Sequence, residues 1–212
     1  MDIHVLYRVI FRLTGTRKKR MKRFTELMRP SADTEIIDIG GTALNWTYLD
    51  VEPRVTLVNK TEVRLDEDHG PTMRVVQGDA TDLDFEDERF DIAFSNSVIE
   101  HLYTRENQVR FAREAKRVGK RVWIQTPARE FFLEPHLITP FVHWLPPSWR
   151  RRLYRNFTVW GLMNRPTRAA VDDLVDEIQL LRRSDMEALF PDCELLVERW
   201  LGMPKSYIAY RS

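Results

Sequence analysis

The sequence predicts an α/β protein with a mostly parallel, doubly wound sheet of seven strands. Short runs rich in Ile, Val and Phe alternate with stretches of helical periodicity, and each run is apolar throughout rather than at every second residue. Strands of this kind are buried on both faces, as in a parallel sheet covered by helices. Two more strand-like runs end the sequence close together, which predicts an antiparallel hairpin at one edge of the sheet.

Five of the expected strands precede residue 128. They are predicted from the runs TEIIDIG, RVTLVNK, TMRVVQGDA, Phe90–Phe94 and KRVWIQTP. TALNWTYLD predicts a short helix after the first strand. A longer helix is expected from Thr104 to Val118, with Val109, Ala112, Ala115 and Val118 on or near one face.

The closing hairpin is predicted from CELLVERWLG and SYIAYRS. A short helix at SDMEALF precedes it, and Ser184 and Glu187 have the spacing of a capping box there.

We interpret residues 31–212 as one domain and residues 1–30 as a basic amphipathic arm. Nine Lys and Arg residues against Asp2 and Glu26 give the arm a net charge of +7, which leaves about −6 on the remainder. Met21, Phe24, Leu27 and Met28 have helical spacing, and Pro30 ends that helix. The arm has two interpretations: a contact with an anionic partner such as a membrane surface, or a solvated helical face that covers part of the domain.

Composition favours a cytoplasmic location. The single cysteine, Cys193, fits a reducing compartment, and no apolar run reaches the roughly 20 residues of a membrane-spanning helix. The amino terminus has arginines within its apolar run, so it is a poor signal peptide.

Residues 128–182 interrupt the alternation of strands and helices and form an insertion after the fifth strand. The insertion is dense in Pro, Trp, Phe and Arg, and AAVDDLVDEIQLL predicts a helix within it. An irregular segment of this length is typically a lid or a binding element. Its aromatic residues indicate either an apolar substrate wall or lid packing: Phe131, Phe132, Phe141, Trp144, Trp149 and Trp160.

Ligands of parallel α/β sheets bind at the carboxyl ends of the strands. The first strand ends at Asp38, Gly40 and Gly41, the second at Asn59 and the third at Asp79. Residues Ser95, Asn96 and Ser97 follow the fourth. A dinucleotide requires a G-x-G-x-x-G turn for its pyrophosphate. That turn is missing, so a nicotinamide or flavin dinucleotide is disfavoured.

The stretch GDATDLDFEDERFDIAFSNSVIEHL, residues 78–102, together with the D-x-G turn, resembles class I S-adenosylmethionine-dependent methyltransferases of the small-molecule type. The resemblance extends over about residues 33–126 and 183–211. It implies a Rossmann-like seven-stranded sheet with a terminal antiparallel hairpin. It also implies S-adenosylmethionine as cofactor and S-adenosylhomocysteine as product.

By position, the resemblance assigns the methionine part of the cofactor to Asp38, Gly40 and Gly41. It assigns the ribose to Asn59, the adenine to Asp79 and Ala80, and the surroundings of the methyl group to Ser95 and Asn96. Thr42 stands at the second glycine of the family motif, and Asn59 stands where the family has an acid. An amide can accept from one ribose hydroxyl and donate to the other, without a charge-assisted bond.

Methyl transfer from a sulfonium needs positioning and removal of the acceptor proton. His101 follows the fourth strand, and His136 with Glu134 in LEPHL would form an oriented base within the insertion. These three are the candidate catalytic residues, although packing roles remain open for both histidines. We expect no metal cluster.

The predicted function is methyl transfer to an oxygen or nitrogen of a small, hydrophobic acceptor. Nucleic acid is not an expected specific partner, because SNSV replaces the Pro-Pro motif of DNA amino-methyltransferases and the body is acidic. Three alternatives remain: a non-catalytic binding protein with this fold, a nucleic-acid methyltransferase recruited by the arm, and, least favoured, a nicotinamide oxidoreductase. The oligomeric state and the identity of the acceptor do not follow from the sequence.

Overall fold

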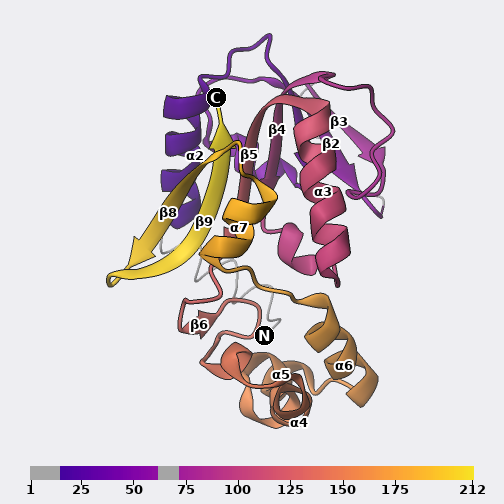
Figure 1. The fold of residues 1–212 in the computed structure, drawn as a ribbon, viewed down its shortest axis with the longest axis vertical. Helices are drawn as coiled ribbons and strands as arrows, with labels where there is room; N and C mark the ends of the chain where they lie inside the picture. The colour runs from indigo at the N-terminus through magenta and orange to yellow at the C-terminus, as the bar shows by residue number, and fades with distance from the viewer. Residues whose placement is uncertain (1–14, 62–71) are drawn as a thin grey trace.

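A computed structural model describes residues 15–61 and 72–212. Its centre is a seven-stranded sheet with the order β3-β2-β1-β4-β5-β9-β8 (Figure 1). The strands are β1 (Glu35–Ile39), β2 (Arg54–Asn59), β3 (Met73–Gln77), β4 (Phe90–Asn96), β5 (Gly119–Pro127), β8 (Glu194–Trp200) and β9 (Met203–Arg211).

The sheet has the predicted mixture of strand directions. β1 pairs in parallel with β2 and β4, β2 with β3, and β4 with β5, whereas β9 runs antiparallel to both β5 and β8. The direction in which successive strands are added to the sheet changes at β1 and β4, which are neighbours although β2 and β3 lie between them in sequence. The predicted fold class, including the terminal hairpin, is confirmed, and the carboxyl ends of β1 and β4 lie side by side at the switch point.

One face of the sheet is covered by α2 (Thr16–Met28) and the 3-10 helix η1 (Ala43–Tyr48). Met21, Phe24 and Met28 are fully buried on the sheet. The Phe24 ring meets three other rings edge-on at centroid distances of 5.3 to 6.0 Å, those of Trp46, Phe94 and Trp123. The described part of the predicted arm, residues 15–30, therefore packs on the core of the domain through one face of α2. Residues 1–14 lie outside the described residues.

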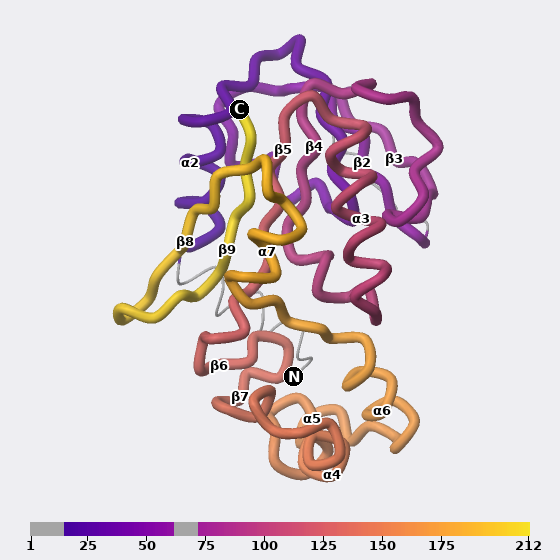
Figure 2. Tube along the Cα trace, in the orientation of Figure 1, coloured from indigo at the N-terminus to yellow at the C-terminus, as the bar shows by residue number. Residues whose placement is uncertain are grey.

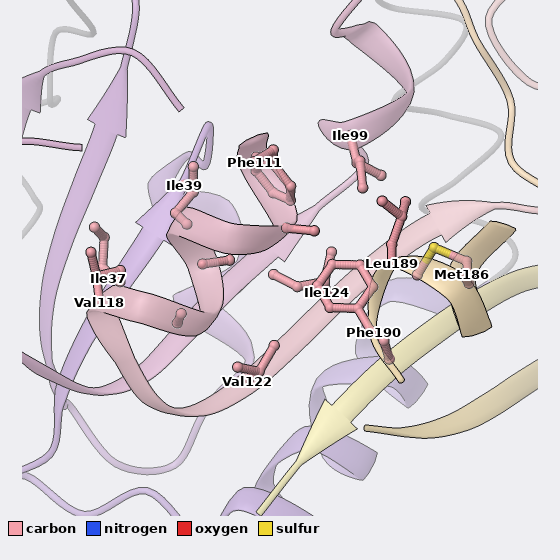
Figure 3. Packing of buried hydrophobic residues seen from close by; sticks show 14 of the residues in the cluster. Ile37, Ile39, Ile99, Phe111, Val118, Val122, Ile124, Met186, Leu189 and Phe190 are labelled. Atoms are coloured by element: carbon pink, nitrogen blue, oxygen red, sulfur yellow. The ribbon is translucent and has the colours of Figure 1, made fainter. Parts of the chain in front are cut away.

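The other face is covered by α3 (Arg105–Val118) and α7 (Arg183–Leu189). Figure 3 shows Phe111 and Val118 of α3 with Met186 and Leu189 of α7 over strand residues such as Ile124. Val109 was predicted near the buried face of α3 but is 50% exposed, because the buried stripe runs instead through Gln108, Phe111, Ala112, Ala115 and Val118.

The starts of α3 and α7 both have a side-chain cap, although not the cap predicted for α7. Thr104 caps α3, with its hydroxyl accepting from Asn107 N at 3.2 Å. The predicted Ser184–Glu187 box at α7 is wrong by two residues: Arg182 is the N-cap, and Asp185 Oδ2 accepts from Arg182 N at 2.8 Å. Asp185 performs the reciprocal role because its carboxylate, three residues into the helix, reaches back to the cap.

The insertion forms a separate group of short elements beside the carboxyl end of β5 (Figures 1 and 2). They are β6 (Leu133–Glu134), β7 (Thr139–Pro140), η3 (Val142–Trp144), α4 (Pro147–Phe157), α5 (Val159–Asn164) and α6 (Arg168–Glu177). Their own small core contains Leu137, Tyr154 and Val171. A parallel bridge between Ala128 and Leu181 joins the two ends of the insertion.

None of the described helices is long and apolar enough to span a bilayer.

Candidate active site

The turn after β1 holds two glycines that the fold requires. Gly40 has φ +73°, and a Cβ there would lie 2.6 Å from Val98 Cγ2. A Cβ on Gly41 would collide with the carboxyl group of Asp38. The Gly40 N–H donates to Val58 O at 2.7 Å, and this bond joins the turn to β2. The turn also lies against Val98 in the loop after β4. Any side chain at either position would displace that loop or the acid.

Asp38 is a fully buried acid at this turn. Its Oδ2 accepts from Trp46 Nε1 at 3.0 Å, whereas its Oδ1 has no partner among the described residues. Burial raises the pKa of Asp38 to about 8, although the Trp46 bond and the charge of Arg17 oppose the shift. A buried carboxylate oxygen without a donor favours a cationic or hydrogen-bonding ligand beside it.

Asn59, at the end of β2, turns its amide toward the glycine turn. Its Nδ2 donates to Gly41 O at 3.0 Å, and the residue is half-buried. This bond explains why an amide serves at this position, because a carboxylate has no N–H to donate to a carbonyl oxygen. Its side-chain oxygen remains as the atom to accept from a ribose hydroxyl.

Asp79 lies exposed just beyond β3, next to half-buried Ala80. Asp79 Oδ1 accepts from both Thr81 N and Thr81 Oγ1 at 2.8 Å, and these bonds hold the pKa of Asp79 below its usual value. The turn fixes one carboxylate oxygen. The second oxygen is left to accept from the adenine amine that the resemblance assigns to Asp79.

The two candidates after β4 have protein partners. Ser95 is fully buried, and its hydroxyl donates to Ile39 O at 2.8 Å, so this side chain ties β4 to β1. Asn96 Oδ1 accepts from Arg20 Nη1 at 2.6 Å. The buried side chain of Ser95 therefore supports the site by holding β4 to β1, whereas Asn96 lies at the rim of the site.

Arg20 is a site residue that the sequence did not reveal. It comes from α2 and bonds Gln125 Oε1 at 2.9 Å and Glu198 Oε2 at 2.6 Å, in addition to Asn96. Arg20 immediately precedes Met21, so it lies at the margin of the buried stripe of α2. This position is the only feature of the sequence that indicates a buried role for its side chain.

A second group of polar side chains lies beyond β4, in η2 (Ile99–His101) and in the loop between β6 and β7. The His101 and His136 rings meet edge-on with centroids 4.7 Å apart. His136 Nδ1 lies 2.7 Å from Glu134 Oε1, so the predicted pairing of these two residues is confirmed. The three predicted catalytic residues are thus brought together across the insertion, although their catalytic role stays a prediction.

Charge is balanced by carboxylates around the histidines. His101 Nδ1 lies 2.9 Å from Glu177 Oε1 of α6. Burial lowers the pKa of His136, but the charge and hydrogen bond of Glu134 outweigh it and raise that pKa above its usual value. Buried Glu100, which the sequence reasoning overlooked, adds a third carboxylate. Its place immediately before His101 was the available signal.

Aromatic side chains form a continuous wall at the same end of the sheet. Phe132 stacks on Trp200 of β8 with centroids 5.8 Å apart, and Phe141 links Phe132 to Trp144. Phe141, Trp144 and Trp200 are each about half exposed. Trp160, by contrast, packs on the small core of the insertion, which is the packing role considered for these rings.

Solved structures share this architecture. A methyltransferase from Archaeoglobus fulgidus described as S-adenosylmethionine-dependent aligns over 99% of this chain and 100% of its own, with 15% identity and a TM-score of 0.60. Burkholderia thailandensis 1,6-didemethyltoxoflavin-N1-methyltransferase with bound S-adenosylhomocysteine aligns over 92% and 76%, with 12% identity and a TM-score of 0.57. Synechocystis magnesium protoporphyrin IX methyltransferase with bound S-adenosylhomocysteine aligns over 93% and 82%, with 10% identity and a TM-score of 0.55. At these identities the likeness establishes the fold.

Residues 36–121, from β1 into β5, match the family model described as a methyltransferase domain. This match and the shared architecture support a class I S-adenosylmethionine-dependent methyltransferase. No curated protein sequence matches the chain.

Proposed function

We propose that the enzyme methylates an oxygen or nitrogen atom of a small, hydrophobic acceptor. The observation that supports this most strongly is that the glycine turn and the histidines lie near one another at the carboxyl ends of the strands. The glycine turn with Asp38 lies at the switch point, and Val98, which packs on Gly40, is followed within three residues by His101. A cofactor at the turn and an acceptor at the histidines would be neighbours.

The residues at the turn fit the cofactor. The unpartnered Oδ1 of Asp38 suits the ammonium of its methionine part, and Gly40 and Gly41 permit close approach of the backbone. Asn59 and Asp79 offer acceptors for the ribose and the adenine amine. This cofactor supplies an electrophilic methyl group on a positively charged sulfur.

The transfer itself is a displacement. A lone pair of the acceptor atom forms a bond to the methyl carbon as the bond from that carbon to sulfur breaks, and S-adenosylhomocysteine leaves. The proton of the acceptor atom must go to a base, and His101, His136 and Glu134 are the groups placed to take it, directly or through water.

The aromatic wall supports the hydrophobic character of the acceptor. Half-exposed rings such as Trp144 and Trp200 offer flat apolar surface beside the polar cluster. The wall is formed by the insertion and β8, both of which lie outside the family match, so the acceptor preference is expected to be particular to this chain.

The outer face of α2 supports a peripheral contact with an anionic membrane. Its core-facing residues are buried, while Lys18, Lys19, Lys22 and Arg23 are exposed on the opposite side. A hydrophobic acceptor residing in a membrane would then be reached from its surface.

The proposed function is tested with S-adenosylmethionine carrying a labelled methyl group and a panel of phenols, catechols and amines. We expect S-adenosylhomocysteine to form with label in the organic-soluble fraction. Label in RNA or DNA, with none in small molecules, would contradict the proposal and favour the nucleic-acid alternative. Tight cofactor binding without turnover on an organic extract would favour the non-catalytic alternative.

A further inference from the structure

Three side chains with metal-binding chemistry converge beyond β4. Glu100 and His101 lie in η2, and His136 lies in the loop between β6 and β7, 35 residues further along the chain. One ligating atom from each of the three lies within 4.8 Å of the other two. Residues this far apart in sequence meet only because the insertion folds back onto the end of β4.

The buried carboxylate of Glu100 is incompletely satisfied. Its Oε2 accepts from Thr126 Oγ1 at 3.0 Å, but Oε1 is buried and has no partner within residues 15–61 and 72–212, and the residue has no exposed surface. An unpaired buried carboxylate oxygen is destabilising unless a donor or a cation is present. Thr126 orients the group and leaves Oε1 for a ligand.

Both histidines are oriented by carboxylates. Glu177 Oε1 lies 2.9 Å from His101 Nδ1, and Glu134 Oε1 lies 2.7 Å from His136 Nδ1. With the proton on Nδ1, each Nε2 carries a lone pair. This carboxylate–histidine pairing is the arrangement that orients histidine ligands around metal ions. Glu134 is itself fixed by the Leu137 N–H, so the orientation extends to the backbone.

We propose that Glu100, His101 and His136 bind a divalent transition-metal cation of the Zn²⁺ type. Two imidazoles and one carboxylate suit Zn²⁺, Fe²⁺ or Co²⁺ better than Mg²⁺ or Ca²⁺, which prefer oxygen ligands alone. Ligands at about 2.1 Å in a tetrahedron lie roughly 3.4 Å apart, so the side chains close by about an ångström on binding. Three carboxylates, those of Glu100, Glu134 and Glu177, offset the charge of the cation.

Three protein ligands leave a coordination position open. This use of the site rests on the proposed function, and the cation takes the place of the histidines in removing the acceptor proton. An acceptor hydroxyl bound at the open position has a lowered pKa and gives up its proton more readily to solvent before attack on the methyl group. A single histidine acting as a base would need one imidazole and one orienting carboxylate. It would not need the second histidine or the unpaired oxygen of Glu100.

The cation site is tested on the untagged full chain after dialysis against a chelator. Calorimetric titration with ZnCl₂ is expected to show one ion per chain, and CoCl₂ is expected to give visible absorption bands of a low-coordinate site. Glu100→Gln and His136→Gln each remove one of three ligands, so each should weaken Zn²⁺ affinity by at least about 100-fold. His143→Gln removes a buried histidine of the same insertion outside the cluster and should leave the affinity unchanged. Circular dichroism melting of each variant establishes that it folds.

Absence of stoichiometric binding, or binding that persists in folded His136→Gln, would overturn the cation site. Titration of the same samples with S-adenosylmethionine separates this failure from that of the proposed function. Cofactor binding without cation binding would overturn the cation site and leave the methyltransferase proposal in place. Cation binding without cofactor binding would support the site and contradict the proposed function.

Discussion

At the scale of single residues, the site is built from groups that are buried at a cost in stability. Asp38 retains a carboxylate oxygen with no partner in the part of the chain that the structure describes, and Gly40 has a positive φ beside Val98 that only a residue without a Cβ adopts freely. Neither feature is needed to complete the core, because Trp46, Phe24 and the strands already fill that face of the sheet. Costs of this kind are typical of positions retained for a ligand.

The raised pKa of Asp38, about 8, makes stability depend on pH. The folded protein holds this proton more tightly than the unfolded chain, so the stability it contributes is present below about pH 4 and is lost as pH rises toward 8. Each pH unit in that interval costs up to about 1.4 kcal/mol. Asp38→Asn should flatten this dependence and melt above the parent protein at pH 8. Parallel melting curves from pH 5 to 8.5 measure it, and identical pH profiles would be inconsistent with a neutral buried acid.

Gly40→Ala should lower the stability for two reasons, the positive φ and the clash of the new Cβ with Val98. Gly202→Ala is the control, because it has only the first of these. Both glycines have positive φ, +73° and +80°, but a Cβ at Gly202 meets nothing within 4 Å. We expect Gly202→Ala to cost about 1 kcal/mol and Gly40→Ala at least about 2 kcal/mol, because Val98 must also move. Urea unfolding of the two variants measures the difference. Equal losses would show that the contact with Val98 is unimportant.

At the scale of elements, Arg20 joins α2 to three strands of the sheet, including β8 at its edge. Arg20 bonds Asn96 of β4, Gln125 of β5 and Glu198 of β8, and Glu198 in turn bonds Ser206 of β9. These contacts hold the first turns of α2 against the carboxyl ends of β4 and β5. The apolar residues of α2 provide most of its burial, whereas Arg20 fixes its position along the sheet.

Arg20→Met should lower the free energy of unfolding by about 2–4 kcal/mol, because it leaves the largely buried Glu198 carboxylate without its cation. Adding Glu198→Gln to the same chain should recover part of the loss. Arg23→Met, on the exposed side of α2 with a solvated ion pair to Glu26, should change stability by less than about 0.5 kcal/mol. Denaturant unfolding of the four proteins measures these values, and a loss in Arg23→Met as large as that in Arg20→Met would refute the assignment.

At the scale of the whole molecule, the sequence predicted the sheet better than the site. Apolar runs and turn residues are local signals, so every strand of the seven-stranded sheet was predicted near its observed bounds. The contact of Arg20 with Glu198 spans 178 residues, and His136 meets His101 through an insertion of irregular sequence. Contacts between residues so far apart in sequence depend on tertiary packing, so local sequence patterns do not predict them. The capping box at α7 failed for a smaller reason, since Asp185 competes with Glu187 for the same role.

The central claim is that the carboxyl ends of β1, β2 and β3 bind S-adenosylmethionine, and calorimetric titration of the parent protein beside Asp79→Asn tests it most directly. Asparagine keeps an oxygen for the two bonds from Thr81 but replaces the second carboxylate oxygen by a donor, so the turn survives and the adenine amine loses its acceptor. We predict micromolar binding in the parent protein and at least about tenfold weaker binding in the variant, the loss of one hydrogen bond to a charged group. No binding at millimolar cofactor, or equal affinity in both proteins, would contradict the account.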